Sequence, residues 1–560
     1  MRKVGIFLLA VIALLAMTGP VSAQPKVTIS GLVDNVTSWT KNMSIVDQNP
    51  ARASDQEWYV RTRVRPDISA EVGTTKFVLG LEIDATWGQT GSTDINVCTN
   101  AGGSACSTSG QAQRFGNTHG WDLNTDAQGV IEIKWAYTEF DLPIMPVPTR
   151  IRLGAQPWEA TYKLAVLAQG DFAGFHMRNQ ITPEIKTNFT YAQIEESNTG
   201  PKDGFLRGDD MALIVSLEWT PFKGLDIRPI YSYANFIGPT SGSSRGARGG
   251  VGAGAAVFPI CPGSAGPASG NCVPGGGNAA ASGSAVENRH TVGVDSRWRF
   301  GAFSVDPTVM YQFGSRDQVV AGTPLKNGNR STLKLDAWLV DVTGGWQAGP
   351  LLLEARVAYV TGNSAGDRID MNESRIKYYQ PISTDSGFWS GWGEVWALGI
   401  DYFSAIRNGS SALQPISSIG YDKYGLMRLG ARGSYALTPA FTLRSAVMAN
   451  WTAEEVDTNG TLAAATGITP GDCTNLQHVR DGCRDKGNSR HLGTELNLGF
   501  QWRFVDKVAL DVVGTYMFAG PALATHLTTS SCVVASCAVA QNGRNPQDVQ
   551  AITARVRYTW

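Results

Sequence analysis

The chain has 560 residues, of which 42% are hydrophobic and 17% charged, and its 47 Lys and Arg nearly balance its 48 Asp and Glu. This balance gives no indication of nucleic-acid binding, and the apolar content excludes a wholly disordered chain. A mean hydropathy of −0.12 excludes a protein built from many transmembrane helices. The length suits several soluble domains or one large closed sheet.

The N-terminus carries one long apolar run, residues 5–17 (GIFLLAVIALLAM). Two basic residues precede the run and the small-residue sequence Val21-Ser22-Ala23 follows it, which is the pattern of a secretory signal peptide. A short membrane anchor is the alternative, but the run is too short to span a bilayer comfortably. We predict a signal peptide over 1–23 and an exported mature chain over 24–560.

From residue 26 onward, apolar and polar side chains alternate with a period of two. In 58–72, for example, one face carries apolar side chains and the other carries Arg61, Arg63 and Arg65. The alternating segments are longer than the five or six residues of an ordinary sandwich strand. Tilted membrane strands need about 9–11 residues, and the sheet must close so that every backbone group is paired. The pattern predicts an all-β fold, a single closed antiparallel transmembrane barrel over 24–560.

Short turns rich in Pro, Gly or Asp alternate with long connections, as expected for periplasmic turns and extracellular loops. The long loops are expected at 89–126, 237–287, 361–423, 453–488 and 520–547. Eighteen strands are predicted, an even number that places both termini on one side: 26–40, 56–72, 75–88, 127–142, 149–156, 171–181, 185–196, 209–221, 225–236, 288–300, 303–313, 332–346, 351–360, 424–437, 441–452, 489–504, 508–519 and 548–560. Promoting 394–403 and a partner near 409–419 to strands would give 20. We favour 18, with 361–423 as a long loop folded inward.

Tryptophans gather at the ends of the predicted strands, as in the aromatic girdles of membrane barrels. These residues are Trp39, Trp58, Trp87, Trp219, Trp298, Trp451, Trp502 and Trp560.

The eight cysteines fall in four local pairs, each within one predicted long loop. An even count in an exported chain indicates disulfides. Metal binding is the alternative, but the pairs lack CxxC spacing and the six histidines are scattered, so no metal site is expected. The predicted pairs are Cys98 with Cys106, Cys261 with Cys272, Cys473 with Cys483, and Cys532 with Cys537.

The C-terminal strand alternates Ile552, Ala554, Val556 and Tyr558 and ends on Trp560. It resembles the C-terminal signal of Gram-negative outer-membrane proteins that the barrel-assembly machinery reads. With the signal peptide and the opening strand KVTISGLVD (26–34), the chain resembles an outer-membrane porin over essentially its whole mature length. Its size and strand number are similar to those of substrate-specific porins and alginate-export-like channels. No plug domain precedes the predicted barrel, which disfavours a TonB-dependent receptor.

The resemblance implies an integral protein of the outer membrane that contacts its lipid and passes small hydrophilic solutes. Basic side chains outnumber acidic ones on the predicted lumen face, and a positive lumen concentrates anions. We therefore expect a preference for anionic solutes. The expected pore-lining residues are Arg61, Arg63, Arg65, Arg150, Arg152, Arg178, Arg297, Arg428, Arg432 and Arg444.

Arg61, Arg63 and Arg65 form a ladder whose steps are about 6.6–6.8 Å along one strand face. Guanidinium groups bind carboxylate and phosphate with two hydrogen bonds, so such a ladder can hand an anion onward. The alternative is that these arginines pair with acids on neighbouring strands and hold the shape of the barrel. The sequence leaves both open.

Two segments could narrow the pore. Segment 157–170 either folds inward as a constriction or packs on the outer rim. Segment 361–423 offers six aromatic side chains that either form a sliding surface inside the pore or belong to the girdle, the latter being favoured. These are Tyr378, Tyr379, Phe388, Trp389, Trp392 and Trp396.

Other chemistry is sparse. Asp122, Asn124 and Asp126 resemble the start of a calcium loop, but the later EF-hand positions do not match, which leaves only a loose surface calcium site as an alternative. No catalytic constellation is recognisable, so no enzyme and no cofactor are expected. A structural sheath around a periplasmic electron carrier is the alternative function. The oligomeric state is open, with a homotrimer among the alternatives.

Overall fold

The computed structural model describes residues 24–42, 56–87, 120–121, 131–195, 210–237, 286–319, 330–364, 375–384, 389, 391–397, 399–400, 424–456, 489–522 and 547–560. The predicted signal peptide, the eight cysteines and the 122–126 motif lie outside these residues, as does most of each predicted long loop. Among the described residues, no helix is long and apolar enough to cross a bilayer.

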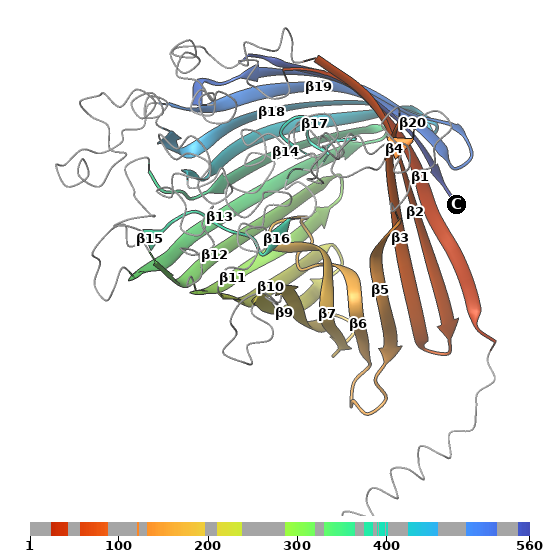
Figure 1. Ribbon diagram of the computed structural model, residues 1–560, viewed down its shortest axis with the longest axis vertical. Coiled ribbons are helices and arrows are strands. Elements are labelled where there is room, and N and C mark those ends of the chain that lie inside the picture. Colours follow the sequence, from red (N-terminus) through yellow and green to blue (C-terminus); the bar gives the residue numbers. More distant parts are fainter. Residues whose placement is uncertain are drawn as a thin grey trace, which may run out of the picture.

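In the part of the chain that the structure describes, eighteen strands of ten or more residues form one antiparallel sheet. Figure 1 shows them following one another around the molecule in chain order. They are β1 (Lys26–Lys41), β2 (Gln56–Val72), β3 (Thr75–Trp87), β5 (Ile131–Asp141), β6 (Thr149–Glu159), β7 (Ala168–Gln180), β8 (Ile185–Glu195), β9 (Asp210–Phe222), β10 (Leu225–Ile237), β11 (Val286–Phe300), β12 (Phe303–Val319), β13 (Arg330–Ala348), β14 (Leu351–Val360), β17 (Leu426–Thr438), β18 (Phe441–Val456), β19 (Ser489–Val505), β20 (Val508–Ala519) and β21 (Val549–Thr559).

These strands confirm the predicted number and order. The largest difference in length is β12, which continues to Val319 instead of ending at 313. The 20-stranded alternative is wrong for the part that is described, because 395–397 form a turn. Three two-residue strands complete the sheet: β4 (Gly120–Trp121), β15 (Arg375–Ile376) and β16 (Ser383–Thr384).

The sheet closes where β1 pairs with β21, with Leu32 opposite Thr559. Beyond this register, the backbones of Gly31 and Trp560 exchange two hydrogen bonds of 3.4 and 3.2 Å. A Cβ atom on Gly31 would lie 2.6 Å from Cζ2 of the Trp560 ring, so a glycine is needed there for the final indole to pack. The terminal aromatic residue therefore sits at the seam that closes the barrel.

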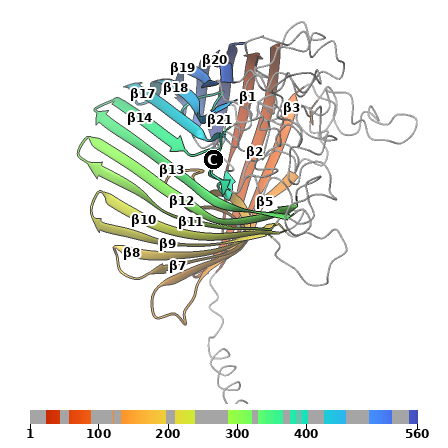
Figure 2. The ribbon, with the colours of Figure 1, turned by 90° about the vertical axis from the view of Figure 1, so that its left-hand side faces the viewer.

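The short connections gather at one end of the barrel (Figure 2). Six of them are two-residue turns, at 73–74, 223–224, 301–302, 349–350, 439–440 and 506–507. Gly73 and Gly301 adopt φ of +60° and +62° there, a conformation that glycine reaches without strain. This confirms the predicted asymmetry between short turns and long connections.

The outer face of the barrel is apolar, with leucine, valine and aromatic side chains exposed along most strands. Trp58, Trp87, Trp219, Trp298 and Trp502 are among the exposed tryptophans at or near strand ends, which confirms these members of the predicted girdles. Such an exterior matches the hydrocarbon layer of a bilayer, and closed antiparallel barrels of this kind are outer-membrane proteins of Gram-negative bacteria. We therefore call the short-turn end periplasmic and the opposite end extracellular.

Candidate functional site

Two connecting segments fold into the lumen from its extracellular end. They are 160–167, between β6 and β7, and 378–397, after β15, of which 378–384, 389 and 391–397 are described. Ile382 N donates to Leu167 O at 2.7 Å, the Tyr379 hydroxyl donates to Val166 O at 3.1 Å, and β16 pairs with β7. Together they form one inner body, which we call the plug. The predicted inward folding within 361–423 is confirmed for these residues, and of the two alternatives left open for 157–170 the structure shows the inward one.

The first plug segment is held at mid-barrel by the side chains of two inward-facing aspartates. Asp295 on β11 accepts hydrogen bonds from the backbone N–H groups of Tyr162 and Lys163, at 2.5 and 3.2 Å. The Lys163 ammonium lies 2.5 Å from Asp341 Oδ1 on β13, and Arg356 binds the other oxygen of Asp341 at 2.7 Å. Burial lowers the pKa of Lys163, while the charge of Asp341 opposes that shift.

Tyr162 projects between two arginines of the wall. Its ring centre lies 3.8 Å from Cζ of Arg228 and 4.0 Å from Cζ of Arg297, within the range of cation–π attraction. Burial is also the main cause that raises the pKa of the Tyr162 hydroxyl. The tip of the plug thus brings an aromatic ring and two guanidinium groups to one level of the lumen.

The second plug segment is held by Glu495 on β19. Its carboxylate accepts hydrogen bonds from the backbone N–H groups of Glu394, Val395 and Trp396, at 2.5, 3.0 and 2.9 Å. Three successive N–H groups pointing at one carboxylate make an anion-binding nest. A buried carboxylate is tolerated here because the backbone supplies the donors that water would otherwise provide.

Aromatic side chains of the plug form an apolar core with the inner wall. Trp389 and Trp396 are completely buried, and Tyr378, Tyr379 and Trp392 nearly so. The guanidinium carbons of Arg356 and Arg428 lie 4.4 and 5.2 Å from the Trp389 ring centre. The favoured assignment of these aromatics to the girdle is therefore wrong for the described residues, because they face the inside of the barrel. Phe388 lies outside the described residues.

The predicted arginine ladder is paired with acids on the neighbouring strand. Arg61 lies 3.3 Å from Asp84, Arg63 lies 2.6 Å from Asp84 and 2.9 Å from Glu82, and Arg65 lies 3.1 Å from Glu82. All five side chains are largely shielded from solvent. The contacts follow the alternative in which the ladder braces β2 against β3.

Arginines of the periplasmic half have a different environment. The side chains of Arg178, Arg297 and Arg444 are 46%, 44% and 49% exposed, whereas their partners Glu218, Asp226 and Asp511 are 17%, 30% and 4% exposed. In the pairs of Arg299 with Asp306 and of Arg432 with Glu354, the arginine side chain is likewise more exposed than the carboxylate. At these five pairs the wall therefore presents guanidinium groups to the lumen and holds the carboxylates behind them, whereas Asp141 is more exposed than its partner Arg150.

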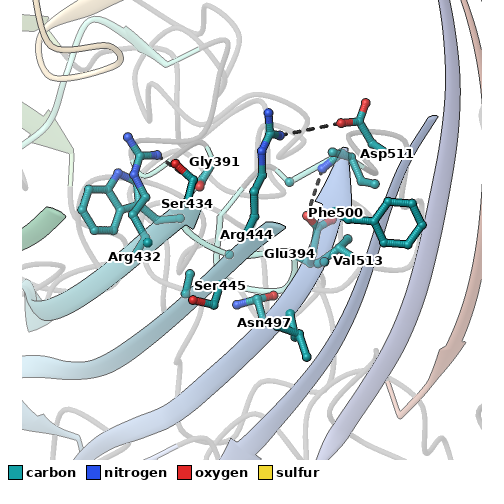
Figure 3. Close-up of a pocket in the computed structure, with 18 of the residues that line it drawn as sticks. Gly391, Glu394, Arg432, Ser434, Arg444, Ser445, Asn497, Phe500, Asp511 and Val513 are labelled. Atoms are coloured by element: carbon teal, nitrogen blue, oxygen red, sulfur yellow. Dashed lines mark hydrogen bonds and ion pairs between the residues drawn. The ribbon is translucent and has the colours of Figure 1, made fainter. Parts of the chain in front are cut away.

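A cavity of about 480 Å³ opens between the plug and β14 and β17–β21. Figure 3 shows Arg432 and Arg444 projecting into it from neighbouring strands. Arg432 binds Glu354 at 2.6 Å and donates to Gly391 O of the plug at 3.2 Å. Asp511 lies 3.6 Å from Arg444 and 2.9 Å from Arg555. The cavity thus joins the plug to the arginine-rich periplasmic wall.

The remaining predicted arginines are distributed around the barrel. Arg150 and Arg152 on β6 share Glu139, at 2.7 and 3.0 Å. Arg428 is buried in the extracellular half, where it donates to Asn450 at 2.5 Å, away from the open lumen. The ten residues therefore line the inner face without converging on one point.

Sequence reasoning missed Lys163 and Asp341, whose ion pair helps to hold the first plug segment. Alternation alone could have placed Asp341 inward, because Trp338 and Val340 on the same strand face outward. Nothing in the sequence pairs it with Lys163, 178 residues away. Among the described residues, no group of three His, Cys, Asp or Glu could hold a metal ion.

No protein-family model matches the chain, and no curated protein matches its sequence. Among solved structures, it is similar to OccK8 (OprE) of Pseudomonas aeruginosa and to a BenF-like porin from Pseudomonas fluorescens Pf-5. Each has 9% sequence identity and a TM-score of 0.44, over 96% of this chain and 98% of the other. OccK9 (OpdG) of Pseudomonas aeruginosa has 9% identity and a TM-score of 0.45, over 95% and 98%.

Proposed function

We propose that this barrel is a diffusion channel of the outer membrane for small hydrophilic solutes, and that it prefers anions. The observation that carries the proposal is the unequal exposure of the ion pairs in the periplasmic half. The guanidinium groups of Arg178, Arg297, Arg299 and Arg444 are exposed on the inner face, while the carboxylates that they pair with are less exposed. A lumen of this kind attracts anions even though nearly every arginine has an acidic neighbour.

The plug supports a selective channel over an open one. Solutes entering from outside must pass the level at which Tyr162, Arg228 and Arg297 meet, and there the low-dielectric surroundings strengthen charge interactions. The alternative of a sheath around an electron carrier needs a wide lumen. The apolar core of Trp389, Trp396 and the inner wall occupies part of that space.

The test is solute flux into liposomes that contain the purified protein. Galactose and gluconate serve as neutral and anionic probes of similar size. We expect gluconate to enter faster than galactose, and the variant R297Q/R444Q to slow gluconate at least about threefold while galactose changes little, because the variant removes charge from the lumen with little change in volume.

The matched control removes two cations outside the lumen, in the periplasmic turns at Lys223 and Lys507. The variant K223Q/K507N should transport both probes like the wild type. Equal flux of the two probes in the wild type would overturn the anion preference. No flux of either probe, from protein that has folded correctly, would overturn the channel itself.

A further inference from the structure

The outer surface of the barrel carries a cluster of basic side chains at its extracellular end. There β15 pairs with β13, placing Arg375 opposite Lys334 and Ile376 opposite Leu335. Ile376 and Leu335 are buried on the inner side. Because neighbouring residues of a strand face opposite ways, Lys334 and Arg375 face outward. Lys377 directly follows β15, and all three side chains are exposed.

Asp336 belongs to the same outward row. It pairs with Arg375 at 3.1 Å and accepts a hydrogen bond from the Tyr311 hydroxyl at 3.4 Å. We call Lys334, Asp336, Arg375 and Lys377 the basic rim patch. With three cations and one carboxylate, the patch is net positive, whereas the barrel wall below it is apolar.

An aromatic band fixes the depth of this patch in the membrane. Trp338 lies two residues from Asp336 toward the membrane centre and pairs with Tyr311 on β12. The ring centres of Tyr311 and Trp338 are 4.4 Å apart, and His290 stacks on Phe313 at 5.0 Å. Below them Val309 and Val340 are exposed. Aromatic belts mark the level at which the hydrocarbon gives way to headgroups. Lys334 lies four residues above Trp338, about 13 Å along the strand, and therefore at headgroup level.

We propose that the basic rim patch binds the phosphate groups of an anionic glycolipid in the outer leaflet. Clusters of lysine and arginine beside a membrane recognise anionic headgroups, and the arginine fork suits phosphate oxygens. The two other cations of the patch, Lys334 and Lys377, have flexible side chains whose ammonium groups bind a phosphate as point charges. The inference rests on the position of the barrel in the membrane and is independent of the channel function.

Native mass spectrometry of the full mature protein in a neutral detergent tests the proposal, with diphosphoryl lipid A as the probe. We expect the wild type to retain the lipid and K334Q/R375Q/K377Q to bind it at least about tenfold more weakly, since each charge contributes about fivefold. The conservative variant K334R/K377R should retain the lipid. Folding is verified by heat-modifiable migration on gels.

The matched control K26Q/K223Q/K507N removes three exposed cations at the periplasmic end and should bind like the wild type. The wild-type protein should not retain lipid A that lacks its phosphates. Millimolar pyrophosphate should not displace bound diphosphoryl lipid A from it. Equal retention by the triple rim variant, equal retention of the dephosphorylated lipid, or complete displacement by pyrophosphate would each overturn the proposal.

Discussion

The same strands line both halves of the lumen, but their inward residues differ in polarity and exposure between the two halves. In the extracellular half, inward residues such as Leu335, Ala337 and Leu339 are apolar and completely or nearly completely buried against the plug. The ion pairs of Glu287 with Arg289 and Arg316 in that half are buried as well. In the periplasmic half, many inward residues are charged, and the guanidinium groups of Arg178, Arg297 and Arg444 are exposed. A closed barrel can therefore be a packed core at one end and a wet, charged passage at the other.

This difference predicts which substitutions change conductance most. Replacing Trp389 and Trp396 by alanine removes two completely buried rings, at a cost of about 3–5 kcal/mol each, and should release the plug from the wall. We expect single-channel conductance in planar bilayers to rise at least about twofold. The control W338A/W346A alters two outward rings and should leave conductance unchanged. Wild-type conductance in a correctly folded W389A/W396A protein would show that the plug does not limit the pore.

A smaller effect is expected at the anchor of the first plug segment. Lys163→Met removes the ammonium from Asp341, which still keeps Arg356 at 2.7 Å. The lost hydrogen bonds are worth about 1–3 kcal/mol, enough to loosen the tip without detaching it. Current recordings should show added noise and a modest rise in conductance, neither of which appears in Lys223→Met. A quiet trace from K163M would mean that Asp295 alone holds the tip.

The ladder provides a comparison within the arginines themselves. Arg63→Gln leaves Glu82 and Asp84 short of a partner, so we expect a lower midpoint for heat-induced unfolding on gels. Its effect on ion selectivity should be less than half that of Arg444→Gln, because Arg63 is shielded and Arg444 is exposed. Reversal potentials of the two variants make the comparison. A larger shift of the reversal potential in R63Q than in R444Q would show that the arginine ladder takes part in ion transport.

The smallest predicted effect is a response to pH. Because burial lowers the pKa of Lys163, the docked plug binds this proton less tightly than a released plug would. Raising the pH toward the ordinary lysine value of about 10.4 therefore favours the docked state, and the contribution is lost as the pH falls. We expect conductance to fall slightly between pH 8 and 10 in the wild type, with no such change in K163M. A rise of conductance with pH would instead mean that deprotonation of Lys163 favours the released plug.

The sequence predicted the barrel well because alternation repeats in every strand and each turn is local. The eighteen strands, the girdle tryptophans and the inward arginines all follow from that period. The plug could not be derived in the same way, since its contacts join residues that are distant in the chain, such as Tyr379 with Val166 and Glu495 with Trp396. Alternation also predicts which face of the sheet a guanidinium occupies, but not whether a carboxylate shields it from solvent. That shielding distinguishes the arginines of the ladder from the exposed arginines of the periplasmic half.

The most direct test of the account is the reversal potential of the wild-type channel in a planar bilayer under a tenfold KCl gradient. We expect the sign that marks chloride as the more permeant ion, and a shift toward zero in R297Q/R444Q. A sign that marks potassium as the more permeant ion would contradict the central claim that exposed guanidinium groups govern the lumen.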